Sequence, residues 1–175
     1  MSIKAAGPLT HLVPVERLPG QGVEVTVEAN EAERAALAED FGVPGVKALS
    51  GRFRVKALAG GGGVKVTGRI RAEVTQVCVV TLEPFDSVLE EEVDVDFVPA
   101  GDPRRRPEPV REDEEHDPPD EIVDGRIDLG ALTAEFLSLG LDPYPRKPGV
   151  DFSYEAGPAP ESPFAALAKL KGEGS

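Results

Sequence analysis

Seven lysine and arginine side chains gather in residues 46–72, a window without a single acidic residue; they are Lys47, Arg52, Arg54, Lys56, Lys65, Arg69 and Arg71. Cations clustered on a rigid support neutralise phosphates and release counterions, which is the chemistry of nucleic-acid contact. All but Lys47 alternate with apolar or small residues on either side of the Gly60–Gly63 run, and this pattern predicts a β-hairpin with a glycine turn. Side chains of like parity share one strand face, so the six cations should lie opposite a buried set formed by Phe53, Val55, Val64, Val66 and Ile70.

An acidic strand is predicted after Pro84, where residues 85–97 alternate between apolar and acidic side chains. Its acids are Asp86, Glu90, Glu92, Asp94 and Asp96. If this strand neighbours the hairpin, cross-strand pairs such as Arg69 with Glu92 would neutralise the cations. The spacing therefore leaves two interpretations open: the six cations contact RNA, or they are balanced by the protein's own acids. A second set of candidate contacts, for a basic protein, is Glu90, Glu92, Asp94 and Asp96.

Residues that could catalyse a reaction are sparse. The two histidines, His11 and His116, are far apart in the sequence, and His116 stands among carboxylates. The single cysteine, Cys78, excludes an internal disulfide and a cysteine-rich zinc site, and its valine neighbours predict a buried small hydrophobic side chain. No nucleophile or zinc-protease motif occurs, and the carboxylates lack the apolar surroundings that tune an acid catalyst. We expect no enzyme, no metal and no cofactor; a metal-dependent hydrolase using the acidic strand is the weaker alternative.

The net charge of −13 is unevenly distributed. Residues 1–80 carry 10 basic and 8 acidic side chains, a net charge of +2, whereas residues 81–175 carry 9 and 24, a net charge of −15. This asymmetry indicates a local basic face on an acidic protein. The sequence shows no membrane-spanning stretch and no signal peptide, so we expect a soluble cytoplasmic protein.

The elements that would position these residues form one α+β domain over 1–155. We predict an antiparallel sheet, curved or barrel-like, with about two packed helices, each with a predicted N-cap, Asn30 or Asp128. Strands are expected within 9–28, on both sides of the glycine turn, over 72–82 and over 85–99, and helices over 31–41 and 129–139. Residues 100–121 hold almost no large apolar side chains and predict a disordered acidic loop. Residues 156–163 should form a linker, and 164–171 a short C-terminal helix.

Three stretches resemble the YceD family, the large ribosomal RNA subunit accumulation proteins of bacteria and plastids. They are VTQVCVVTLEPFDSVLEEEVDVDF, DEIVDGRIDLGALTAEFLSLGLDPYPRKPG and SPFAALAKLK. Many members carry further cysteines in the strand motif and in the proline-rich exit, a possible metal site. Here only Cys78 matches, Thr81 stands at the second cysteine position, and 141–149 has none. The resemblance therefore does not extend to metal binding.

The resemblance implies a non-enzymatic role in ribosome biogenesis. The expected partner is large-subunit ribosomal RNA or a pre-ribosomal particle, contacted through Arg52, Arg54, Lys56, Lys65, Arg69 and Arg71. The alternative is an acidic module that holds a basic ribosomal protein.

Overall fold

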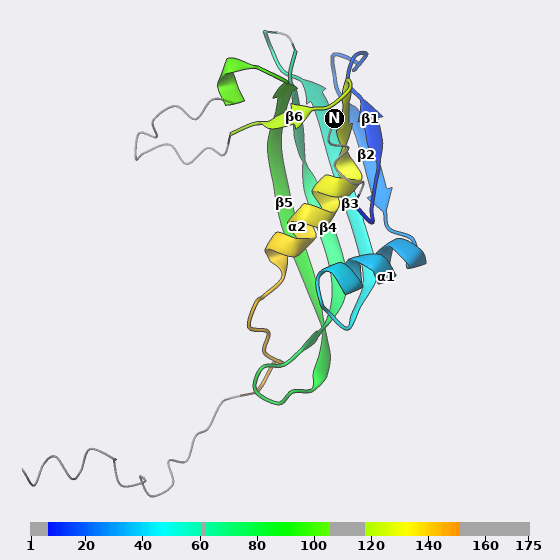
Figure 1. The fold of residues 1–175 in the computed structure, drawn as a ribbon, viewed down its shortest axis with the longest axis vertical. Helices are drawn as coiled ribbons and strands as arrows, with labels where there is room; N and C mark the ends of the chain where they lie inside the picture. The colour runs from blue at the N-terminus through cyan, green and yellow to red at the C-terminus, as the bar shows by residue number, and fades with distance from the viewer. Residues whose placement is uncertain (1–6, 61, 106–117, 151–175) are drawn as a thin grey trace, which may run out of the picture.

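The computed structural model describes residues 7–60, 62–105 and 118–150. The main sheet has five strands in the order β2-β3-β4-β5-β6, and two short strands pair separately. The five are β2 (Val23–Glu28), β3 (Gly45–Ala57), β4 (Val64–Val77), β5 (Pro84–Pro99) and β6 (Asp120–Ile122). The remaining elements are β1 (Leu12–Pro14), β7 (Arg126–Asp128), α1 (Glu31–Asp40) and α2 (Leu129–Gly140). Figure 1 shows both helices in front of the long, twisted sheet.

The predicted α+β class is confirmed, and the sheet is open. Strands β2 to β5 are antiparallel to their neighbours, but β6 runs parallel to β5, so the sheet is mixed. The outer strands β2 and β6 do not pair with each other, and the barrel-like form of the prediction is therefore not observed. Periodicity did not predict β6, because a three-residue strand is too short to show a period.

The predicted strand over 72–82 is wrong in its boundaries. Residues 64–77 form one strand of 14 residues, so the first half of that segment belongs to β4. A turn then replaces the second half: Cys78 N–H donates to the Glu83 carbonyl at 2.9 Å, and Leu82 adopts a left-handed φ of 59°. The apolar run misled the prediction because Val77 and Val79 are exposed at the end of the sheet and not buried within it.

Both helices begin where the sequence predicts. Asn30 and Glu33 form a reciprocal capping box at the start of α1, and Gly42 follows the helix with a left-handed φ of 63°. At the start of α2 the Asp128 side chain accepts hydrogen bonds from the backbone N–H groups of Gly130 (2.9 Å) and Ala131 (3.1 Å). These caps satisfy backbone donors that a helix start leaves without partners.

One hydrophobic core lies between the sheet and the helices. The predicted inward residues Phe53, Val55, Val64, Val66 and Ile70 are all buried, and Leu37 of α1 and Leu137 of α2 join them in the same cluster. Gly68 of β4 allows the two central strands to pack closely. A Cβ atom there would lie 2.2 Å from the Arg52 carbonyl oxygen and 2.9 Å from the Phe53 Cα.

The structure describes both ends of the predicted loop at 100–121. Residues 103–105 form a 3₁₀ turn, and the Asp102 carboxylate accepts hydrogen bonds from the Arg104 backbone and side chain. The Arg104 side chain and backbone N–H lower the pKa of Asp102 to about 2. At the far end, Asp120–Ile122 is β6. Residues 106–117, which include His116, lie outside the described residues, as do the predicted linker 156–163 and helix 164–171.

Candidate nucleic-acid interface

The six hairpin cations lie on the sheet face that the helices leave uncovered. All alternate with buried side chains of β3 and β4, as predicted from their parity. Five are exposed; Lys65 is half-buried. Two pairs of cations face each other across the strands, Arg52 opposite Arg69 and Lys56 opposite Lys65. The face is therefore positively charged along its two central strands.

The acidic strand β5 lies directly beside β4, and its carboxylates bind the β4 cations. Lys65 Nζ lies 2.6 Å from Asp94 and 3.3 Å from Asp96, and Arg69 Nη2 lies 3.3 Å from Glu92. A further ion pair joins Arg71 to Glu90. The predicted Arg69–Glu92 pair is confirmed. We call this set of β4 cations and β5 carboxylates the charge ladder; its members are Lys65, Arg69, Arg71, Glu90, Glu92, Asp94 and Asp96.

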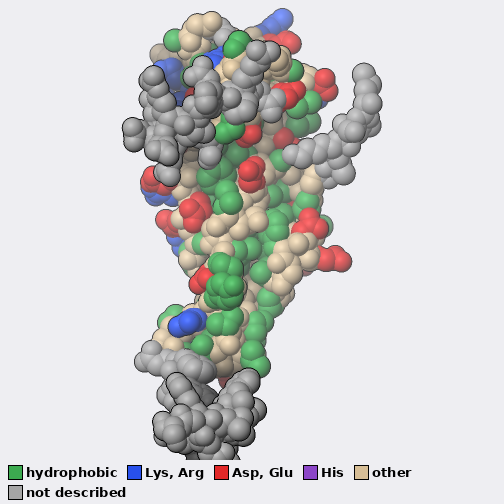
Figure 2. Space-filling model, turned by 60° about the vertical axis from the view of Figure 1, so that its left-hand side comes forward, with side chains coloured by type: hydrophobic (Ala, Val, Ile, Leu, Met, Phe, Trp, Pro, Cys, Tyr) green, Lys and Arg blue, Asp and Glu red, His purple; other side chains and the backbone are tan. Residues whose placement is uncertain are grey.

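The seventh cation, Lys47, is also paired. It binds Asp86, which additionally accepts a hydrogen bond of 2.7 Å from the Thr75 hydroxyl. The hydrogen bond to Asp86 raises the pKa of Lys47, and the same bond lowers the pKa of Asp86. Within the ladder, hydrogen bonds to Asp94 and Asp96 raise the pKa of Lys65. Figure 2 shows acidic and basic side chains side by side along the margin of the sheet.

Three of the four β3 cations differ from the rest of the cluster. Within the described residues, Arg52, Arg54 and Lys56 form no ion pair, and we call them the β3 strip. The Arg54 Nη2 donates a hydrogen bond of 3.5 Å to the Gln21 carbonyl, and Glu24 of β2 is its cross-strand neighbour. The structure thus leaves three of the seven cations without an ion-pair partner among the described residues. They are spaced two residues apart on one strand.

Sequence reasoning missed this division because it depends on strand register. Cations alternate with buried residues in both β3 and β4, at Arg52, Arg54 and Lys56 and at Lys65, Arg69 and Arg71. Only the register shows that β4 lies beside a strand with five acids on this face, whereas β3 neighbours Glu24, Thr26 and Glu28 of β2. The acidic composition of residues 85–96 was the available signal. It indicated that carboxylates could form ion pairs with hairpin cations, but not with which of them.

Cys78 is buried in the turn after β4, as its valine neighbours predict. Its Sγ accepts a hydrogen bond of 3.3 Å from the Lys147 backbone N–H. This bond, together with hydrogen bonds from Thr81, lowers the pKa of the thiol to about 6. Two further contacts fasten the exit segment to the turn: Val79 N–H donates to the Pro145 carbonyl at 2.9 Å, and Lys147 Nζ lies 3.1 Å from Glu83.

The described part of the chain holds no group of three or more histidine, cysteine, aspartate or glutamate side chains placed to bind a metal ion. At the position of a second cysteine, Thr81 instead hydrogen-bonds the Cys78 sulfur.

The His11 backbone N–H donates a hydrogen bond of 2.8 Å to the Asp128 side chain, and the His11 carbonyl accepts one from the Leu129 N–H. None of the described helices is long and apolar enough to cross a bilayer.

Comparison with known proteins identifies a family. A family model described as "Large ribosomal RNA subunit accumulation protein YceD" matches residues 66–171, which cover most of β4 and all of β5 and α2. No curated protein and no solved structure matches the chain. The match spans more than half of the 175 residues and includes every member of the charge ladder except Lys65, whereas the β3 strip lies before it. The chain belongs to the YceD family.

Proposed function

We propose that this chain is a non-enzymatic cytoplasmic factor that supports accumulation of large-subunit ribosomal RNA, and that it contacts RNA through the β3 strip. Membership of the YceD family carries the ribosomal role. The contact is supported by the three cations of the strip, which have no ion-pair partner within the described residues and project from a rigid central strand. Cations without an ion-pair partner can neutralise phosphates without first separating from a carboxylate.

The charge ladder is a poorer RNA surface for a physical reason. Each of its cations already lies beside a carboxylate, and a phosphate approaching Arg69 or Arg71 would meet Glu92 or Glu90 as well. Like charges at close range repel, so the ladder offers little net attraction to a polyanion. The proposed RNA surface is therefore narrower than the six cations predicted from the sequence.

The test compares a triple variant with a quadruple control variant in binding to purified large-subunit ribosomal RNA. The strip variant carries Arg52→Gln, Arg54→Gln and Lys56→Gln. The matched control removes two complete ladder pairs, with Arg69→Gln, Glu92→Gln, Arg71→Gln and Glu90→Gln, and leaves the net charge unchanged. Each phosphate contact contributes about 0.7 to 0.9 to the slope of log affinity against log salt. Loss of three contacts should thus reduce the slope by about 2 and the affinity at least tenfold.

The ladder control should bind RNA within about twofold of the native chain, because its ion pairs are exposed and worth little. Circular dichroism and thermal unfolding check that both variants fold. Equal binding by the strip variant and the native chain would contradict the contact. So would a loss of affinity in the ladder control as large as that in the strip variant.

A basic ribosomal protein bound by the β5 acids is a second candidate. It is favoured by an excess of acid on that strand: Asp94 and Asp96 share the single cation of Lys65. Tagged full-length chain should then retain its ribosomal-protein partners after ribonuclease digestion. Release of those partners by ribonuclease would support the RNA contact instead.

A further inference from the structure

Strand β5 leaves most of one edge without a strand partner. Its inner edge pairs with β4 from Pro84 to Phe97, whereas its outer edge pairs with β6 only from Phe97 to Pro99. Within the described residues, no other segment hydrogen-bonds the backbone of 84–96 on that outer side. Figure 1 shows β5 as the outermost long strand on this side of the sheet. An unpaired edge of this length is a template for a further strand.

The direction of each β5 backbone group follows from a hydrogen bond at the end of the sheet. In antiparallel strands, residue pairs that exchange hydrogen bonds alternate with pairs that do not. The Cys78 N–H donates to the Glu83 carbonyl at 2.9 Å, and this pair continues the β4–β5 register. Odd-numbered β5 residues therefore bond to β4, and even-numbered residues direct their N–H and C=O groups outward. Between Pro84 and the residues next to β6, the outward-directed residues are Asp86, Val88, Glu90, Glu92 and Asp94.

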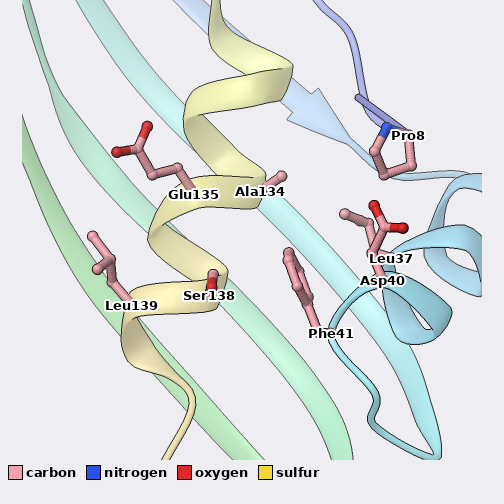
Figure 3. Close-up of a pocket in the computed structure, with 8 residues that line it drawn as sticks. All are labelled: Pro8, Leu37, Asp40, Phe41, Ala134, Glu135, Ser138 and Leu139. Carbon is pink, nitrogen blue, oxygen red and sulfur yellow. The ribbon is translucent and has the colours of Figure 1, made fainter. Parts of the chain in front are cut away.

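The two faces of this edge differ in chemistry. On the open face, the side chains of Glu92 and Asp94 remain 84% and 66% exposed although each binds a β4 cation. A carboxylate accepts up to about four hydrogen bonds, so each can bind a second cation from outside. On the helix side, Leu89 and Val95 are half-buried, and Leu139 of α2 is exposed. Figure 3 shows Leu139 on the side of α2 that is turned away from α1. A strand added here would meet carboxylates on one face and apolar side chains on the other.

We propose that the outer edge of β5 binds an extended protein segment in which cations alternate with apolar residues. Strand β4 is the precedent, because Lys65, Arg69 and Arg71 alternate with buried residues and bind these carboxylates from the inner edge. Strand addition gives affinity through main-chain hydrogen bonds and specificity through alternate side chains. The inference rests on the second candidate function, a basic protein partner at β5, and specifies how that partner binds.

Charge selects against a second copy of this chain as the occupant. Two β5 edges would bring carboxylates opposite carboxylates. Pairing of β5 with the other outer strand, β2, would do the same, because the exposed residues of β2 include Glu24 and Glu28. Like charges directly opposite each other destabilise a strand pair, whereas opposite charges stabilise it. A basic segment therefore fits this edge better than any outer strand of the chain itself.

A synthetic octapeptide with blocked ends, in which valine alternates with lysine and arginine, tests this edge. Fluorescence anisotropy measures its binding to the full chain. Hydrogen exchange followed by nuclear magnetic resonance then locates it. The peptide should slow exchange at least about threefold at the outward N–H groups of Val88, Glu90 and Glu92, because they gain a hydrogen-bond partner. The N–H groups of Leu89 and Glu91 already bond to β4 and should change little.

A proline on the edge provides the variant. Val88→Pro removes an outward N–H without changing the charge, and proline is tolerated where an edge N–H faces solvent. It should weaken peptide binding at least about tenfold, since the ring also occupies the space of the partner backbone. The matched control is Thr26→Pro on β2. The Ala29 N–H donates to the Leu49 carbonyl, and the same alternation directs the Thr26 N–H outward. This control should bind the peptide as the native chain does.

Three results would overturn the proposal. The peptide could fail to bind, or bind Val88→Pro as tightly as the native chain. It could bind without slowing exchange along β5, which would mean that charge alone holds it. Light scattering could show dimers in which the outward N–H groups are already protected, which would assign the edge to a second copy.

The ribonuclease experiment separates this inference from the function on which it rests. Ribosomal-protein partners retained equally by the native chain and by Val88→Pro would keep that function and overturn strand addition. Slowed exchange along β5 with the peptide, but no partner retained by the native chain, would support strand addition and contradict the function. Neither result depends on the RNA contact, because no β5 residue belongs to the β3 strip.

Discussion

The β3 strip and the cations of the charge ladder are the same kinds of side chain on the same face of one sheet, and they differ in their neighbours. In the ladder, Lys65, Arg69 and Arg71 are all within ion-pair distance of β5 carboxylates. In the strip, Arg52 lies between Arg69 of β4 and Thr26 of β2. Lys56 faces Lys65 of β4 and has no described strand partner on its other side. The comparison teaches that alternation determines which face a cation occupies, whereas the adjoining strand determines whether its charge is available.

The largest effect on stability should come from truncating a buried side chain that lies beneath both regions. Ile70 is fully buried in β4 beneath them. Ile70→Ala removes buried methyl and methylene groups and leaves a cavity, so we expect the free energy of unfolding to fall by about 2–5 kcal/mol. Urea denaturation measures it.

The matched control is Arg69→Ala, one residue away on the exposed face. It removes only an exposed ion pair and should change the free energy of unfolding by less than about 1 kcal/mol. Equal losses for the two variants would show that the charged face contributes to stability as much as the core does, which contradicts the division of roles between the faces.

Gly68→Ala should have the next largest effect, because this glycine lies where the strip and the ladder meet. Its added Cβ would approach the Arg52 carbonyl oxygen to 2.2 Å, and backbone cannot yield as a flexible side chain does. Overpacking of this kind costs about 1–3 kcal/mol. Thermal unfolding should therefore show a lower midpoint for Gly68→Ala than for Thr67→Ala at the adjacent half-buried position. Unchanged stability would indicate that β3 and β4 can move apart to admit the added methyl group without a loss of stability.

Much of the fold could be predicted because its signals are local. The parity of Phe53 and Val55 against Arg52 and Arg54 identified the buried face, and Asn30 and Asp128 marked the helix starts. These features depend on neighbours within a few residues.

The division of the candidate site could not be predicted in the same way. Strand register brings Arg69 beside Glu92, 23 residues away, and it leaves Arg52 without such a partner. The three-residue β6 and the turn at Cys78 were missed for a related reason, since each is held by contacts between distant segments.

Freeing one ladder cation from its carboxylate, so that it adds to the strip, should raise the affinity for RNA by a smaller factor. Glu92→Gln frees Arg69, which lies directly opposite Arg52. If the strip binds RNA, the affinity for large-subunit ribosomal RNA should rise about twofold to fivefold, the equivalent of up to about 1 kcal/mol for an exposed pair. Fluorescence anisotropy at fixed salt measures this change.

The control for that variant is Glu135→Gln, which removes the same charge from α2 on the other side of the sheet. It should leave RNA affinity nearly unchanged. Equal gains from Glu92→Gln and Glu135→Gln would mean that net charge alone governs binding, and the distinction between strip and ladder would lose its functional meaning.

A pH dependence should separate the turn at Cys78 from the ladder. Hydrogen bonds from Lys147 and Thr81 lower the pKa of the folded thiol to about 6, below the ordinary value near 9. Between these values the unfolded chain binds more protons than the folded one, so stability should rise with pH from about 6 to 9 and lose this contribution as pH falls through 6. Thermal midpoints should thus rise across it in the native chain and rise less in Cys78→Ser, while Arg69→Gln with Glu92→Gln should keep the native pH dependence. An identical pH profile in Cys78→Ser would show that the thiol does not titrate in this range.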